Sequence, residues 1–285
     1  MANKVAIVTD STAYIPKDRL ASITCEIAPA LVIWEGEDLR DGFDIQPDEF
    51  YKRLKTAKEM PTTSQPSPGA FKEVFEGLLA KGYDILGVFI SSKLSGTFAS
   101  AQQAKGMLPD ANIELVDTLS ASMGAGWPIL LAGEAANKGA SLAECKKIVE
   151  DAIKHVGVLL TVDTLEFFHR GGRISGVERF VGTALKFKPI LELVSDGTLI
   201  PLEKARTRTK AINRLLELMV DRIGGRSPVY LASIHCDDLE MAKEVLERAK
   251  ALVDVKDTLI SPVSPAVGTH TGPGTIGLVF LAGYK

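Results

Sequence analysis

Cysteine is scarce in this chain: Cys25, Cys145 and Cys236 are its three cysteines, far apart and with no CxxC pair. This spacing matches neither a metal site nor a disulfide framework, so we expect three packing residues. The sequence also lacks an HExxH motif and any cluster of histidine with carboxylates. The glycine-rich run at 268–274, GTHTGPG, is not a GxGxxG fingerprint and does not follow a strand pattern. The sequence therefore predicts no metal and no cofactor.

Long hydrophobic runs and a strong net charge are also missing. The longest apolar run, near residues 276–282, is too short to span a bilayer, and no basic segment with a long apolar stretch precedes the first strand pattern. With 33 basic and 36 acidic residues the net charge is −3, which gives no field for nucleic acid or an anionic membrane. We expect a cytoplasmic protein with no nucleic-acid partner and no stable membrane insertion.

What the chain does contain is ordinary globular composition, with 46% hydrophobic and 24% charged residues. A length of 285 residues suggests about two domains. No internal repeat or low-complexity segment is present. Because the pattern of elements changes near residue 158, we expect an N-terminal α/β domain at 1–157 and a C-terminal α/β domain at 158–285.

The first half alternates strand and helix patterns, with polar loops after the strands. This alternation predicts a parallel sheet with helices on both faces, and binding sites at the carboxyl ends of its strands. Strands are expected at residues 4–9, 26–34, 84–90 and 112–116, a turn or hairpin at 35–44, an extended loop at 61–69, and helices at 47–55, 71–81, 97–106, 123–138 and 141–156.

The second half predicts a mixed sheet. The Asp196-Gly197 pair between two apolar runs indicates a β-hairpin, because a tight turn needs positive φ. The segment 168–174 is basic and hinged on Gly171 and Gly172. Further strands are expected at 157–162, 229–234, 258–261 and 275–281, helices at 209–223 and 239–252, and an irregular loop at 264–274.

Three hydroxyl-rich loops, at 62–65, 95–97 and 268–272, are candidate binding elements, and none of them contains Lys or Arg. A phosphate site usually adds a basic side chain to backbone N–H groups, whereas hydroxyls and a helix start can hold one negative charge. The loops therefore favour a carboxylate ligand. The plain alternative is that Ser95 or Thr97 only caps the helix that follows.

His270 and the arginines each have an ordinary explanation beside a functional one. His270 can be a hydrogen-bonded loop residue. Ser95, His270 and Asp10 would make a hydrolase triad, but the GxSxG elbow is absent because the serine sits in LSGT. Four arginines in the second half can be ordinary solvated surface charges: Arg170, Arg173, Arg206 and Arg208. Arg173, which follows two glycines, can also approach a phosphate or a carboxylate.

Six motifs in unchanged order carry a family resemblance. They are VTDST at 8–12, TSQPS at 63–67, SSKLSGT at 91–97, VDT at 116–118, GGRIS at 171–175 and HTGPGTIG at 270–277. Together they resemble the DegV family, the fatty-acid-binding proteins that act as the acyl-carrying subunit of bacterial fatty acid kinase. The resemblance runs from the first strand to the last.

The resemblance implies one long-chain, palmitate-like fatty acid in a tunnel between the two domains. Its carboxylate would be held by the hydroxyls of Thr63 and Ser95 and approached by the backbone N–H of Gly96. His270 would stand beside the head group through water, and Ser64 is a secondary candidate.

The resemblance also implies that the protein is not itself an enzyme. A separate ATP-binding kinase subunit would phosphorylate the presented carboxylate, and Arg173 and Arg206 match positions linked in the family to docking or activity with that subunit. Two other hypotheses stay open. One is an enzyme acting on a small carboxylate or ester with Ser95 and His270; the other is a ligand sensor without a kinase partner.

Overall fold

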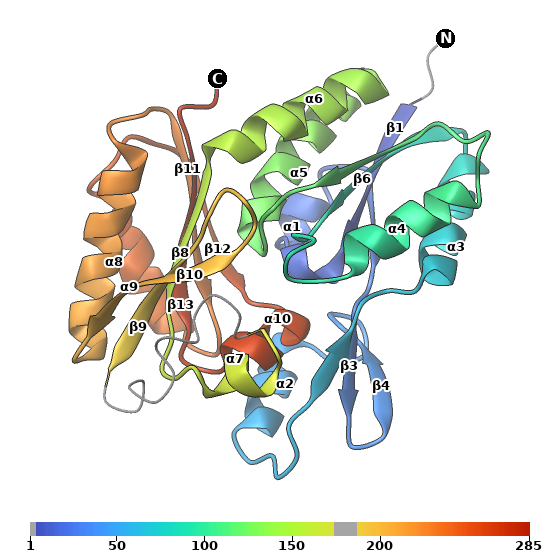
Figure 1. The fold of residues 1–285 in the computed structure, drawn as a ribbon. Helices are drawn as coiled ribbons and strands as arrows, with labels where there is room; N and C mark the ends of the chain where they lie inside the picture. The colour runs from blue at the N-terminus through green and yellow to red at the C-terminus, as the bar shows by residue number, and fades with distance from the viewer. Residues whose placement is uncertain (1–3, 174–186) are drawn as a thin grey trace.

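The computed structural model describes residues 4–173 and 187–285 of the chain. Figure 1 shows an α/β arrangement in which two larger sheets lie on either side of a central helix, with a small sheet at one end. Within the described residues the sheets have four, six and three strands. The predicted fold class, a parallel sheet in the first half and a mixed sheet in the second, is confirmed.

The four-stranded sheet is parallel throughout, in the order β2-β1-β6-β7. Its apolar strands are covered on both faces. Phe71 and Phe75 of α3 pack with Phe89 on one face, together with α4, while α5 and α6 pack on the other face. The bounds are β1 Lys4–Asp10, β2 Cys25–Ala28, β6 Tyr83–Phe89, β7 Ile113–Asp117, α3 Pro68–Leu79, α4 Thr97–Gly106, α5 Met123–Asn137 and α6 Leu142–Ala152.

The six-stranded sheet has the order β10-β9-β8-β13-β11-β12, and only its β11–β12 pair is parallel. Helices α8 and α9 cover its outer face (Figure 1). The predicted hairpin is β9–β10, and Gly197 at its turn has a φ of +85°. The bounds are β8 Val156–Thr161, β9 Lys188–Leu193, β10 Leu199–Ala205, α8 Arg208–Ile223, β11 Val229–His235, α9 Leu239–Lys250, β12 Val255–Pro262 and β13 Ile276–Ala282.

Helix α5 lies between the two larger sheets and contacts strands of both. Trp127 on α5 packs against Tyr230 of β11, with ring centroids 5.4 Å apart. A continuous cluster of buried side chains therefore runs from the first half into the second. The four-stranded sheet ends before residue 157 and the six-stranded sheet starts at Val156, but the proposed domain boundary at 157/158 stays a prediction.

The expected strand at 26–34 is wrong, because the segment forms two strands in different sheets. Strand β2 ends at Ala28, and after Pro29 the chain enters β3 (Leu31–Trp34) of a small antiparallel sheet. That sheet joins β4 (Glu37–Arg40) and β5 (Thr62–Ser64) to β3. This small sheet therefore contains part of the turn or hairpin predicted at 35–44 and part of the extended loop predicted at 61–69. Helix α2 (Pro47–Leu54) lies between these two segments in the sequence.

The irregular loop expected at 264–274 is also wrong, because residues Pro265–Thr271 form helix α10. Ser264 accepts a hydrogen bond from the N–H of Val267, and Pro265 occupies the first turn. A second short helix, α7 (Glu166–Arg170), precedes Gly171 and Gly172. In Figure 1, α7 and α10 lie close together below the six-stranded sheet. Shorter elements are η1 Ser11–Ala13, α1 Lys17–Leu20 and η2 Ile153–His155.

Three structural findings concern the cysteines, the lengths of the apolar helices and the grouping of metal-binding side chains. Cys25, Cys145 and Cys236 are free thiols, and the last two are buried. In residues 4–173 and 187–285, no helix combines the length and apolarity that crossing a membrane requires. The same residues contain no group of three or more His, Cys, Asp or Glu side chains placed to hold a metal ion.

Candidate functional site

A cavity between the two larger sheets collects most of the predicted site residues. Its empty volume is about 990 Å³, which includes space open to solvent. The loops after β1, β6 and β7 line it from the first half, as the position of parallel strand ends predicts. Strands of the six-stranded sheet and helices α7 and α10 line it from the second half.

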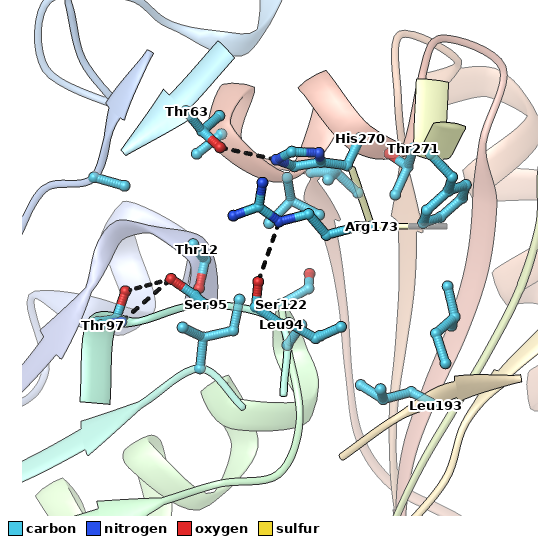
Figure 2. A pocket seen from close by; sticks show the side chains of 18 of the residues that line it. Thr12, Thr63, Leu94, Ser95, Thr97, Ser122, Arg173, Leu193, His270 and Thr271 are labelled. Atoms are coloured by element: carbon cyan, nitrogen blue, oxygen red, sulfur yellow. Dashed lines mark hydrogen bonds between the residues drawn. The ribbon is translucent and has the colours of Figure 1, made fainter. Parts of the chain in front are cut away.

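One wall of the cavity is apolar because alternate strand residues face it. Val158 and Leu160 lie two apart on β8, Leu193 and Leu199 pair across the β9–β10 hairpin, and Ile234 lies on β11. Figure 2 places Leu193 away from the Ser95 loop, across the cavity. This wall offers a ligand hydrocarbon contacts and no hydrogen bonds.

The other end of the cavity is polar, and Thr63 and His270 meet there. Thr63 lies on β5 and His270 on α10, yet Thr63 Oγ1 is 2.9 Å from His270 Nε2 (Figure 2). Their separation in sequence is 207 residues. Ser64, the next residue on β5, also lines the cavity. The structure thus brings together three residues predicted to bind the head group.

His270 is a neutral imidazole at ordinary pH. Burial, and to a smaller extent the positive charge of Arg173, lowers the pKa of His270 from its ordinary value to about 4. The other ring nitrogen, Nδ1, is buried and has no hydrogen-bond partner among the described residues. His270 therefore provides hydrogen bonding without a charge.

Ser95 lies in the loop between β6 and α4 and lines the cavity. Its Oγ is 2.8 Å from Thr97 Oγ1 and accepts a 3.3 Å hydrogen bond from the N–H of Thr97. This second bond is local helix capping, which agrees with the alternative that Ser95 only caps the following helix. Ser95 does both: it orders the helix start and borders the cavity. Gly96 is the N-cap of α4, and a side chain there would meet the Gln65 amide, its Cβ being 2.9 Å from Nε2.

A buried carboxylate holds two of these loops together. Asp10, at the end of β1, accepts 2.9 Å hydrogen bonds from the N–H groups of Thr12 and Ile90. Thr12 and Ile90 both line the cavity. Thr12 was missed as a site residue, although its place in VTDST directly after the first strand was a usable signal.

A second buried carboxylate supports helix α10 from behind the cavity. Asp41 accepts hydrogen bonds from Ser11 Oγ at 2.6 Å and from the N–H of Ala266 at 3.2 Å. Burial raises the pKa of Asp41 to about 7. Asp41 thus fixes the start of the helix that carries His270 against the first half of the chain.

Arg173 lines the same cavity. The three hydroxyl-rich loops contain no basic residue, so their sequences do not predict a positive charge here. Its guanidinium lies between the Thr63–His270 pair and the Ser95 loop, and Nε donates to the Leu94 carbonyl at 3.4 Å (Figure 2). The polar end is therefore positively charged. The rest of the GGRIS motif, Ile174 and Ser175, lies outside the described residues. Arg206 is exposed and lies outside the cavity lining.

The hydrolase triad is not assembled. Within the described residues no hydrogen bond joins Ser95 to His270, and His270 Nε2 faces Thr63 instead. Both carboxylate oxygens of Asp10 are occupied by the N–H groups of Thr12 and Ile90. The geometry therefore gives no support to a serine nucleophile activated by this histidine.

Comparison with known proteins gives one consistent answer. The model of the family described as "Uncharacterised protein, DegV family" matches residues 4–283. Protein DegV of Bacillus subtilis is 35% identical over 276 residues, which is 96% of this chain and 98% of that protein. Two solved structures cover nearly all of both chains.

The first is a DegV family protein from Thermus thermophilus described for its fatty acid binding, 33% identical, with a TM-score of 0.89 over 98% of this chain and 99% of that one. The second is a stearic-acid-binding protein from Eubacterium ventriosum, 25% identical, with a TM-score of 0.90 over 100% of this chain and 99% of that one. Both resemble this chain along its whole length.

Proposed function

Since this chain belongs to the DegV family, we propose that it binds one long-chain fatty acid in the cavity and presents the carboxylate to a separate ATP-binding kinase subunit, which forms an acyl phosphate. The observation that carries the proposal is one cavity with an apolar wall of strand residues and a polar end at Thr63, Ser95 and His270. The chain itself is a non-catalytic, cytoplasmic carrier of a palmitate-like ligand.

In this proposal the hydrocarbon wall supplies affinity and the polar end supplies orientation. A C16 chain buries roughly fifteen methylene or methyl groups at about 0.8 kcal/mol each. One or two head-group hydrogen bonds contribute only about 1 kcal/mol each. Even a fraction of the tail term exceeds the head-group term, so removal of the hydroxyls should misplace the carboxylate more than it weakens binding.

The head group is assigned to the polar end. Thr63 and Ser95 donate hydrogen bonds from their hydroxyls to the carboxylate, and the backbone N–H of Gly96 approaches it. Neutral His270 stands beside the carboxylate, and Ser64 is a secondary contact. Exposed Arg206 suits docking of the kinase subunit. Arg173 is assigned to docking by its motif alone. Its side chain lies in the cavity, so its position adds no support for docking.

The first test is the bound ligand. The purified protein is denatured, extracted with organic solvent and analysed by mass spectrometry. Near-equimolar long-chain fatty acid supports the carrier, whereas an empty protein that hydrolyses model esters supports the enzyme hypothesis with Ser95 and His270. Acyl phosphate formed on addition of kinase subunit and ATP excludes a ligand sensor without a kinase partner.

The second test separates binding from presentation. The Thr63→Ala, Ser95→Ala double variant should keep part of its fatty-acid binding and lose most of its phosphorylation by a matched kinase subunit, because the tail still fits while the carboxylate is no longer oriented. Thr62→Ala is the matched control, since Thr62 is exposed on the same short strand. Unchanged phosphorylation of the double variant would count against the proposal.

A further inference from the structure

Ser122 is a cavity residue that the proposed head-group contacts do not include. It directly precedes helix α5, and Figure 2 shows it among the side chains that line the cavity. Only 4% of the residue is exposed, and its Oγ has no hydrogen-bond partner among the described residues. A buried hydroxyl without a partner is unfavourable, because it has lost the water that it bonds in the unfolded chain. Ser122 therefore offers a hydrogen bond to a partner from outside the protein.

The other hydroxyls that line the cavity differ from Ser122 in this respect. Within residues 4–173 and 187–285, each of them shares a hydrogen bond with another side chain or with a backbone carbonyl. They are Thr12, Thr63, Ser64, Ser95, Thr97, Thr271 and Thr275. The unpaired state of Ser122 is thus specific to its position and is not a general property of this cavity.

The backbone turns the Ser122 side chain away from the helix that follows. A serine in this place usually has extended backbone and accepts a hydrogen bond from the second or third N–H of the helix. Ser122 has a φ of +51° and a ψ of −139°, and its side chain makes no such bond. The N–H of Gly124 already donates to the Ala121 carbonyl at 3.0 Å, and the N–H of Ala125 donates to the backbone carbonyl of Ser122, also at 3.0 Å. Helix capping therefore does not explain a serine in this strained conformation.

The chain on either side of Ser122 packs against the apolar wall. A Cβ on Gly124, two residues later, would lie 2.9 Å from Val158 Cγ2 on β8. Leu119, three residues earlier, lies so close to the β9–β10 turn that a Cβ on Gly197 would be 3.2 Å from its Cδ2. Ser122 thus belongs to a segment that borders the hydrocarbon side of the cavity.

The proposed carboxylate contacts lie on other segments. Thr63 is on β5 and His270 on α10, and in the view of Figure 2 Ser122 lies on the Leu193 side of Ser95. An acyl chain that runs from Ser95 toward the apolar wall therefore passes Ser122. A saturated chain leaves this hydroxyl unpaired, whereas a hydroxyl on the chain can both donate to it and accept from it.

We propose that the cavity prefers a long-chain fatty acid that carries a hydroxyl group on its acyl chain, and that Ser122 Oγ is the hydrogen-bond partner of that group. This inference rests on the proposed function and narrows its ligand class. Because the carboxylate is held at the polar end and Ser122 is fixed at the start of α5, one position of the hydroxyl along the chain fits best.

The experiment is a cycle of two proteins and a panel of ligands in the absence of kinase. Delipidated wild type and Ser122→Ala are titrated with palmitate and with hydroxypalmitates that differ only in the carbon that carries the hydroxyl. In wild type, one regioisomer should bind about tenfold more tightly than the others, because a hydroxyl elsewhere on the chain is buried without a partner.

The substitution should move the two kinds of ligand in opposite directions. Ser122→Ala should weaken binding of the preferred hydroxypalmitate about tenfold, because the hydroxyl of the ligand loses its partner. It should tighten palmitate binding about threefold, because the saturated chain no longer covers an unpaired hydroxyl. Ser120→Ala is the matched control, since Ser120 is equally buried in the same loop and is not among the described residues that line the cavity. Urea unfolding of each variant checks that it is folded.

The outcomes separate this inference from the function beneath it. Equal weakening of palmitate and hydroxypalmitate by Ser122→Ala would mean that Ser122 serves the carboxylate or the fold, and would overturn the inference. A wild type that binds all the hydroxypalmitates equally would also overturn it. Both results leave the carrier function standing, whereas a wild type that binds neither palmitate nor any hydroxypalmitate would overturn the proposed function as well.

Discussion

The two sides of the cavity are built by different means. The apolar wall comes from strand faces, where Leu160, Leu193 and Ile234 are fixed by sheet register. The polar end comes from a loop, the short strand β5 and the short helix α10. Thr63 and His270 are held by a contact between segments far apart in sequence, whereas Ser95 is held by local hydrogen bonds with Thr97. A sheet gives a continuous surface for a flexible tail, whereas loops place single groups around one small head group.

A charge placed in the apolar wall should disturb ligand binding most. Leu199→Asp should weaken palmitate binding by at least about 100-fold, because a carboxylate beside the acyl chain must lose its water. Leu199 is on the edge strand β10, which keeps the change local. Ile200→Asp, which projects from the opposite face of β10 and is absent from the cavity lining, is the control. Equal binding by the two variants would show that this wall does not hold the tail.

The pH dependence of the polar end should be smaller. The folded pKa of His270 is about 4, below the ordinary 6.5, so the unfolded chain binds more protons between these values. Its contribution is present above pH 6.5 and is lost as pH falls toward 4, by about 2 kcal/mol at pH 5. His270→Gln should remove this loss in the free energy of unfolding measured with urea at pH 8 and pH 5.

One background titration and one control variant bear on that measurement. Asp41 has the opposite sign, because its pKa is raised to about 7 and its stabilisation falls as pH rises, but it is present in both proteins and cancels. His169→Gln replaces an exposed histidine near the site. An equal pH slope in wild type and His270→Gln would contradict the neutral, buried state of His270.

Gly171→Ala tests how the two short helices set the polar end. The new Cβ would displace the His270 ring from Thr63, and we expect a roughly tenfold lower rate of ligand phosphorylation by the kinase subunit. The matched control is Gly77→Ala, where a Cβ meets nothing within 4 Å. Wild-type phosphorylation in Gly171→Ala would mean that the placement of His270 is unimportant for presentation.

The hydrogen bond that links the two sides of the cavity should contribute least to stability. Ser91, in the loop after β6, donates a 2.9 Å hydrogen bond to the Gly197 carbonyl in the β9–β10 turn. Ser91→Ala should lower the free energy of unfolding by about 1 kcal/mol in urea denaturation. Ser92→Ala, at the exposed neighbour, should leave it unchanged. A loss shared by both variants would mean that the loop sequence matters and not this bond.

Much of the fold was predictable because helices and strands are local patterns. The alternation of residues 84–106 gave β6, the Ser95 loop and α4, and Asp196-Gly197 gave the hairpin. The errors fell where tertiary contacts decide. Residues 26–34 read as one strand, but the chain changes sheets after Pro29. The Ser264-Pro265 start of α10 was a usable helix signal, hidden by the glycines and threonines that follow.

Local sequence is enough to predict the hydroxyl loops and the order of the motifs that mark the family. The packing of the fold places Arg173 at 3.4 Å from the Leu94 carbonyl beside the Ser95 loop and brings Thr63 to His270. Local patterns specify a turn or a helix, whereas contacts across 79 and 207 residues depend on how the sheets pack. The chain thus encodes the hydroxyls of the polar end locally and its positive charge only through the fold.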